Sequence, residues 1–150
     1  MNDALITGAS SGLGRALALE LARSKPELVL IGRDEKALAS THKDCLKAGS
    51  PEVLTLVIDL ALPDASAQIQ AALAEKSIQV EILVNNAGIG VHGEFVDTAI
   101  ELEIELVHVQ IDTMLALTKV FLPGMLARER GKILNVGSVY SFAPVPRQAV

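Results

Sequence analysis

Three glycines near the start of the chain have a spacing that suits a phosphate-bearing ligand. Gly8, Gly12 and Gly14 lie in the stretch Thr7-Gly8-Ala9-Ser10-Ser11-Gly12-Leu13-Gly14, which follows a short apolar run and leads into a helical pattern. A strand, a glycine-rich turn and a helix in this order are the context that a dinucleotide site requires. Gly8 permits a tight turn, Gly12 a close approach of the backbone to a pyrophosphate, and Gly14 close packing of the helix on the sheet.

The start of this helix also offers hydrogen-bond donors for an anion. Its free backbone N–H groups and the positive end of its dipole attract a phosphate, and the hydroxyls of Ser10 and Ser11 add two donors. Leu13 opens the helix beside them and is counted with the cofactor-binding residues. A solvent loop with spare glycines is the alternative. The three residues between the first two glycines argue against the common G-x-G-x-x-G dehydrogenases, and the missing Lys-Ser or Lys-Thr excludes a P-loop.

Arg33, at the end of the second predicted strand, bears on the choice of cofactor. An adenosine ribose is expected at this strand end, where an NAD-dependent enzyme needs a carboxylate for the 2′-hydroxyl. Gly32 occupies that place and Arg33 follows it. A guanidinium binds a 2′-phosphate through charge-assisted hydrogen bonds, which favours NADP(H) over NAD(H). The alternative is a solvated arginine at a strand end, and Asp34 is better explained as a helix cap.

Two later strand ends add candidate contacts to a dinucleotide. Asp59 can accept a hydrogen bond from an adenine amino group while Leu60 covers the ring, and a simple turn is the alternative. The next strand is followed by Asn85-Asn86-Ala87-Gly88. Its asparagine amides can tie neighbouring strand ends together, and Ala87 and Gly88 are small enough for a flat ring to lie against them.

Ser138 presents a hydroxyl at the end of the fifth predicted strand, in the stretch Asn135-Val136-Gly137-Ser138. There it can donate a hydrogen bond to a substrate carbonyl oxygen, and a plain turn residue is the alternative. It has no histidine close in sequence to activate it, so we do not expect a hydrolytic mechanism. We assign no metal ligands.

Short β-rich runs alternate with helical stretches along the whole chain, which predicts right-handed βαβ units and one parallel sheet. The predicted strands are Ala4–Thr7, Leu28–Ile31, Val53–Ile58, Ile82–Asn85 and Lys132–Val136. The predicted helices are Gly12–Ser24, Asp34–Ala48, Pro63–Lys76 and Thr98–Arg130. Pro123 is expected to kink or interrupt the last and longest of them. Apolar residues on more than one face of that helix indicate cover on two sides.

The composition is that of one globular domain with a buried sheet. The chain has 150 residues, half of them hydrophobic, and a mean hydropathy of +0.40. A net charge of −5 without a basic cluster argues against nucleic acid as a partner. Cys45 is the only cysteine, which favours a reducing, cytoplasmic compartment. We expect neither a signal peptide nor a membrane span, because the first strand begins within about three residues and no uninterrupted apolar run approaches roughly 18 residues.

Taken together, these residues resemble the short-chain dehydrogenase/reductase family. The matching segments follow one another in order along the chain: Thr7-Gly8-x-x-x-Gly12-x-Gly14, Asp59-Leu60, Asn85-Asn86-Ala87-Gly88, Leu122-Pro123-Gly124-Met125 and Gly131-Lys132-Ile133-x-Asn135-Val136-x-Ser138. The resemblance implies a Rossmann-like, doubly wound α/β fold with strand order 3-2-1-4-5, incomplete on its C-terminal side. It also implies NAD(P)(H)-dependent oxidation of alcohols or reduction of carbonyls, with Ser138 as the catalytic serine.

Two departures from the family pattern affect the predicted active site. The family's asparagine in the long helix, which supports a water in a proton relay, corresponds to Gln110. Its carbonyl is displaced by one methylene unless the helix adjusts, and an indifferent helix former is the alternative. The family's Tyr-x-x-x-Lys would begin immediately after Val150, which favours a portion of a longer enzyme over a naturally short relative. Tyr140 is too near Ser138 to replace that tyrosine, and the residue four beyond it is Pro144.

We therefore expect the cofactor-binding part of an NADP(H)-preferring oxidoreductase that acts on a small-molecule alcohol or carbonyl, with NAD(H) as the second option. The segment itself is expected to be inactive for lack of the Tyr/Lys pair. The rival hypothesis is a non-catalytic dinucleotide-binding sensor or interaction module. An intact chain is expected to form a dimer or tetramer through the long helix. Residues 1–150 alone are expected to aggregate or oligomerise, because the strand Lys132–Val136 lacks a neighbour.

Overall fold

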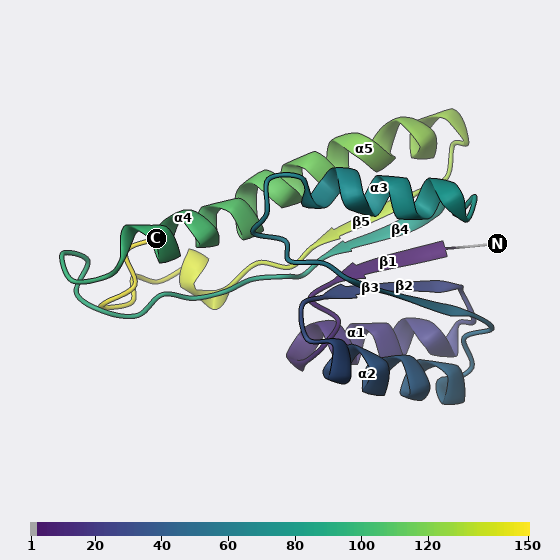
Figure 1. Ribbon diagram of the computed structural model, residues 1–150, viewed down its shortest axis with the longest axis horizontal. Coiled ribbons are helices and arrows are strands. Elements are labelled where there is room, and N and C mark those ends of the chain that lie inside the picture. Colours follow the sequence, from purple (N-terminus) through teal and green to yellow (C-terminus); the bar gives the residue numbers. More distant parts are fainter. Residues whose placement is uncertain (1–2) are drawn as a thin grey trace.

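The computed structural model describes residues 3–150, which form one parallel sheet with helices on both faces (Figure 1). The strands lie in the order β3-β2-β1-β4-β5, and every neighbouring pair is parallel. Their bounds are β1 Asp3–Thr7, β2 Leu28–Gly32, β3 Val53–Val57, β4 Val80–Asn85 and β5 Lys132–Asn135. The predicted Rossmann-like α/β class and strand order are confirmed, and each predicted strand boundary is correct to within two residues.

Two pairs of helical segments cover the two faces of the sheet (Figure 1). Helices α1 Gly12–Arg23 and α2 Glu35–Ala48 cover one face. Helix α3 Ala65–Glu75 and the long helical stretch towards the C-terminus cover the other. Helix α2 begins as predicted, because Asp34 Oδ1 accepts a hydrogen bond from Ala37 N at 2.9 Å.

The central strands are buried on both faces and separate two apolar cores. In β1, Leu5 faces the core under α3 and the long helix, whereas Ala4 and Ile6 face the core under α1 and α2. Such strands read as continuous apolar runs, which explains the high mean hydropathy of the chain. Cys45 lies in the second core, where burial raises the pKa of its thiol to about 11. The thiol therefore stays protonated near neutral pH.

The long predicted helix, Thr98–Arg130, consists of three consecutive segments. They are α4 Ile100–Val107, the π-helical turn η1 His108–Asp112 and α5 Thr113–Ala127. The interruption expected at Pro123 is wrong, because α5 continues for four residues beyond the proline. Packing of Leu117 and Met125 into the core holds α5 on the sheet despite the missing N–H donor. The irregularity of the helix falls at η1 instead.

The outer face of this helical stretch is open to solvent. Leu115, Leu122 and Leu126 are exposed. Ile100–Ala127 spans 28 residues with a mean hydropathy of 1.2 in an 18-residue window, of which 22% is buried, so by length and composition alone it could cross a membrane. In the structure α5 lies along the sheet, whereas α4 extends beyond the ends of the strands (Figure 1). Cover on its second side and the absence of a membrane partner stay predictions.

Strand β5 forms one edge of the sheet within residues 3–150. It pairs with β4 in the register from Ile82↔Lys132 to Asn85↔Asn135, and Leu134 is exposed. A strand edge with unpaired N–H and C=O groups can pair with another chain. The expected aggregation or oligomerisation of residues 1–150 stays a prediction, and this edge supports it.

Two leucines on α5 test whether burial on the sheet holds the helix. Leu117→Ala removes a fully buried side chain and is expected to lower the free energy of unfolding of the full chain by about 2–5 kcal/mol. Leu115→Ala, on the same helix but 57% exposed, is expected to change it by less than about 0.5 kcal/mol. Urea denaturation of both variants measures the difference. Equal losses would contradict the burial of Leu117 against the sheet.

Candidate functional site

One threonine ties the carboxyl ends of β1 and β4 together. Thr7 Oγ1 accepts hydrogen bonds from the backbone N–H groups of Asn86 and Ala87, at 2.9 and 3.0 Å. The same hydroxyl donates to the carbonyl oxygen of Val84 at 3.3 Å. In return, Asn86 Nδ2 donates to the carbonyl oxygens of Thr7 and Gly8, at 2.9 and 3.4 Å. The predicted tie between strand ends through asparagine amides is confirmed.

A second amide ties β4 to β5. Asn85 Nδ2 donates to Asn135 Oδ1 at 2.8 Å, and it also reaches Thr118 Oγ1 of α5 at 3.4 Å. The loop that carries Ser138 leaves the sheet directly after Asn135. The bond between the two asparagines therefore fixes the point from which that loop departs.

The glycine-rich turn packs against the same strand ends. A Cβ atom on Gly14 would overlap with the carbonyl oxygen of Gly8 and with Asn86 Nδ2. Gly8 itself has a φ of +67°, and a Cβ atom there would lie 2.9 Å from the Cα of Ala87. Only glycine lets α1 begin this close to the end of β4, which is the packing that the sequence predicts for Gly14.

A groove of about 380 Å³ at the carboxyl ends of β1 to β4 brings all the predicted cofactor-binding residues together. These residues are Gly8, Ser10, Ser11, Gly12, Leu13, Gly14, Arg33, Asp59, Leu60, Asn86, Ala87 and Gly88. Around Gly12 the groove is open, since no atom lies within 4 Å of an added Cβ. Ser11 precedes α1 without a side-chain capping bond, so its hydroxyl is available to a ligand.

Asp59 and Leu60 serve the fold as well as the groove. Asp59 Oδ1 accepts a hydrogen bond from Ala61 N at 3.0 Å. This bond is typical of the simple turn that the sequence allows as the alternative role of Asp59. Its other carboxylate oxygen faces no hydrogen-bond donor within residues 3–150. The carbonyl oxygen of Leu60 accepts from Thr113 Oγ1 at 2.8 Å, which joins the end of β3 to the start of α5.

Arg33 lines the groove but has a partner that the sequence analysis did not identify. Its Nη1 lies 3.1 Å from Glu105 Oε1 on α4. The side chain of Arg33 is 63% exposed and that of Glu105 is 27% exposed. The two residues are 72 positions apart, and no local pattern indicates such a pair.

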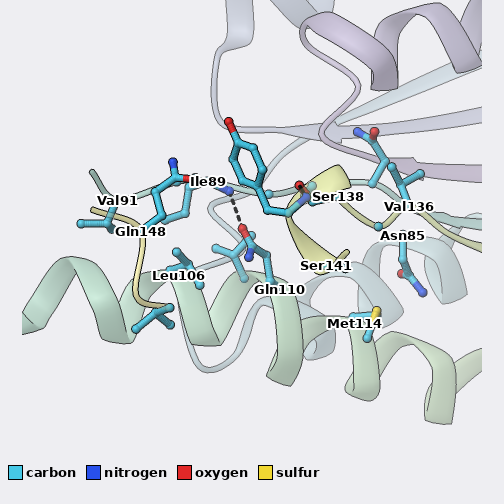
Figure 2. A pocket seen from close by; sticks show the side chains of 18 of the residues that line it. Asn85, Ile89, Val91, Leu106, Gln110, Met114, Val136, Ser138, Ser141 and Gln148 are labelled. Carbon is cyan, nitrogen blue, oxygen red and sulfur yellow. Dashed lines mark hydrogen bonds between the residues drawn. The ribbon is translucent and has the colours of Figure 1, made fainter. Parts of the chain in front are cut away.

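A second cavity, of about 690 Å³, is lined by Ser138 and Gln110 (Figure 2) and adjoins the groove. The residues that line both are Leu60, Asn86, Ala87, Gly88, Ile89 and Val109. Ser138 precedes the short 3-10 turn η2 Val139–Ser141, and its Oγ accepts a hydrogen bond from Tyr140 N at 3.1 Å. Because that bond uses a lone pair of Oγ, the hydroxyl proton remains available to a ligand in the cavity.

Gln110 lies in the π-helical turn η1 and points at the loop after β4. Its Oε1 accepts a hydrogen bond from Ile89 N at 2.8 Å (Figure 2). A Cβ atom on Gly88 would lie 3.2 Å from the same oxygen. Gln110 thus holds the loop after β4 from within a π-helical turn. Its part in a proton relay stays a prediction.

Two further polar groups near the site carry no clear sequence signal. Thr7 directly precedes the first glycine, and no local pattern indicates that its hydroxyl joins β1 to β4. The Oε1 atom of Gln148 is buried at the second cavity without a hydrogen-bond partner among residues 3–150. Within residues 3–150, no group of three or more His, Cys, Asp or Glu residues is arranged to hold a metal ion.

The fold and the groove together define a dinucleotide-binding class of α/β protein, because the groove lies where the strand order reverses between β1 and β4. Comparison with known proteins identifies the family within that class. The family model described as short chain dehydrogenase matches residues 2–150. The chain therefore belongs to the short-chain dehydrogenase family, as its motifs predict.

Relatives and solved structures agree with this assignment. The chain is 36% identical to the very-long-chain 3-oxoacyl-CoA reductase of Laccaria bicolor and 37% identical to the dehydrogenase/reductase SDR family protein 7-like of Anopheles gambiae, in each case over 97% of this chain. It spans 44% and 47% of their lengths, so it corresponds to less than half of each relative.

Two solved structures match nearly the whole fold. A metagenomic short-chain oxidoreductase in complex with NADP has a TM-score of 0.89 and 32% identity, with 99% of this chain and 67% of that chain covered. A short-chain dehydrogenase from Sphingobium yanoikuyae in complex with NADPH also has a TM-score of 0.89 and 32% identity, with 99% and 58% covered.

Two substitutions of Thr7 test the tie between β1 and β4. Thr7→Val keeps the shape of the side chain but leaves the N–H groups of Asn86 and Ala87 without their acceptor. We expect it to lower the free energy of unfolding by about 1–3 kcal/mol. Thr7→Ser keeps the hydroxyl and is expected to cost less than the valine. Thermal and urea unfolding measure both, and a valine variant at least as stable as the serine variant would contradict the structural role of the hydroxyl.

Proposed function

We propose that the protein to which this chain belongs is an oxidoreductase that uses NADP(H) to interconvert a small-molecule alcohol and a carbonyl. The observation that carries the proposal is that the two cavities adjoin. The glycine-rich groove and the cavity of Ser138 share the residues Asn86, Ala87 and Gly88. A dinucleotide in the groove would therefore lie next to the cavity that contains the serine. The NADP and NADPH complexes of the two matching structures support the choice of cofactor.

The groove has the donors and acceptors that a dinucleotide needs. The hydroxyls of Ser10 and Ser11 and the N–H groups at the start of α1 would hold the pyrophosphate, where Gly12 leaves room for it. The second carboxylate oxygen of Asp59 would accept from the adenine amino group beside Leu60. The guanidinium of Arg33, which suits a 2′-phosphate, completes the set.

In the second cavity, this chain's own residues would bind the substrate. Ser138 would donate a hydrogen bond to the substrate oxygen, since its own oxygen already accepts one from Tyr140 N. Gln110 holds the loop at Ile89 and so shapes the cavity wall. A bound nicotinamide supplies or accepts the hydride. We infer that the proton donor would be the tyrosine of a Tyr-x-x-x-Lys motif beyond Val150. A phenol has a pKa of about 10, and the ammonium of the lysine would lower that pKa towards neutrality, which corresponds to about 4 kcal/mol of differential stabilisation.

The same proposal extends to assembly and location. The exposed apolar side chains of α4, η1 and α5, such as Ile104, Ile111 and Leu115, support a homo-oligomer, a dimer or a tetramer, through this face. A cytoplasmic location rests only on the use of a single, buried cysteine.

Arg33 tests the preference for the phosphorylated cofactor. The full chain is expected to bind NADPH about tenfold to a hundredfold more tightly than NADH, because a charge-assisted hydrogen bond contributes about 1.5–3 kcal/mol. Arg33→Ala is expected to abolish this preference without weakening NADH. Arg23→Ala, at the end of α1 and away from the groove, is the control. Titration calorimetry with both cofactors measures the affinities, and equal affinities in the unaltered protein would contradict the assignment.

Substitution of Ser138 tests the proposed role of its hydroxyl in carbonyl reduction. Ser138→Ala in the full chain is expected to lower kcat for carbonyl reduction by about 10²–10³, the cost of removing one donor to a developing oxyanion. Ser40→Ala, at an exposed position on α2 outside both cavities, is expected to keep its turnover. The rate is followed by NADPH absorbance across a panel of carbonyl compounds. Full activity of the Ser138 variant would refute its role, and tight cofactor binding with no turnover on any carbonyl would favour the non-catalytic dinucleotide-binding module.

A further inference from the structure

The ion pair between Arg33 and Glu105 stands at one end of the proposed cofactor groove. Arg33 follows β2 and Glu105 lies on α4, and Nη1 and Oε1 are 3.1 Å apart. Both residues line a separate cavity of about 580 Å³ that meets the groove at Arg33. A phosphate that approaches the guanidinium from the groove therefore meets an arginine that already holds a carboxylate.

From this geometry we infer that Glu105 is a specificity-determining residue that weakens the preference for the 2′-phosphorylated cofactor. The inference rests on the proposed function and deepens it. The carboxylate occupies one donor of the Arg33 guanidinium and offsets its positive charge, and both effects act on the phosphate only through Arg33. The phosphate must displace the carboxylate or share the guanidinium with it, and each possibility costs affinity that NAD(H) does not lose.

The geometry of the ion pair indicates that Glu105 competes with the phosphate for Arg33 and does not orient the arginine for it. A carboxylate fixes the plane of a guanidinium best through two parallel hydrogen bonds. Here the contact between Arg33 and Glu105 is a single hydrogen bond from Nη1, and most of the arginine side chain is exposed. Glu105 thus restrains the direction of Arg33 only weakly. Its own side chain is more buried than that of Arg33, so solvent screens its charge less.

Glu105→Gln isolates the charge, because glutamine keeps the length of the side chain and can still accept a hydrogen bond from Arg33. Exposed ion pairs correspond to about 1.5-fold to fivefold in an equilibrium constant. We expect the variant to bind NADPH about two- to fivefold more tightly, with NADH unchanged, and the gain to shrink as the salt concentration rises. Glu101→Gln removes the same charge about one helical turn earlier on α4 and is expected to change neither affinity.

The experiment measures the dissociation constants of NADPH and NADH by calorimetry for the full chain, Glu105→Gln, Glu101→Gln, Arg33→Ala and the double variant of Arg33 and Glu105. In the Arg33→Ala background, Glu105→Gln is expected to have no effect on the ratio of the two affinities. That result, with a gain confined to NADPH in the single variant, supports the inference.

Five results would overturn it. A weaker affinity of Glu105→Gln for NADPH would show that the carboxylate orients the arginine. An equal gain in Glu101→Gln would assign the effect to the overall charge of the helix, and a gain that persists without Arg33 would separate it from the ion pair. If the unaltered chain binds neither dinucleotide, the proposed function fails and this inference with it. If both bind and Glu105→Gln changes nothing, only the inference fails.

Discussion

The hydrogen bonds of the Thr7 hydroxyl are the constraint on which the site depends. In a sheet of order 3-2-1-4-5, the chain leaves β1 towards one side and β4 towards the other, so a crevice opens between the two strand ends. The hydroxyl accepts from two successive N–H groups after β4 and so fixes where that segment turns away. The amide of Asn86 completes the tie from the opposite side. Both walls of the crevice are therefore set by one pair of residues.

The glycine-rich turn and this tie depend on each other. The start of α1 reaches the crevice only because Gly14 has no side chain to meet Asn86. Asn86 in turn keeps its place through the carbonyl oxygens of Thr7 and Gly8. A change at any of these positions moves the helix N-terminus relative to β4. The positive end of the helix dipole acts only near the first turn, so its use for a phosphate requires this position.

The sequence predicts the fold well where local rules and core packing agree. The buried strands are apolar runs because both of their faces are covered, and Asp34 begins α2 through a bond to a residue three positions away. Local rules fail where tertiary contacts decide. Pro123 is tolerated because Leu117 and Met125 keep α5 on the sheet. The groove is predicted residue by residue through the family motifs, but the carboxylate beside its arginine comes from a helix distant in sequence.

The π-helical turn η1 contributes Val109 and Gln110 to the cavity of Ser138, and no local sequence pattern predicts this turn. It is held between two polar contacts: Gln110 accepts from Ile89 N at one side, and Thr113 directly after the turn donates to the carbonyl oxygen of Leu60. An i→i+5 turn inserts a residue relative to a regular helix, and such turns are frequent at functional sites. Within this turn Gln110 Oε1 lies close to Gly88, where an added Cβ would be 3.2 Å away, and Leu117 on the following helix is packed in the core. The same helical stretch thus lines the cavity through η1 and covers the sheet through α5.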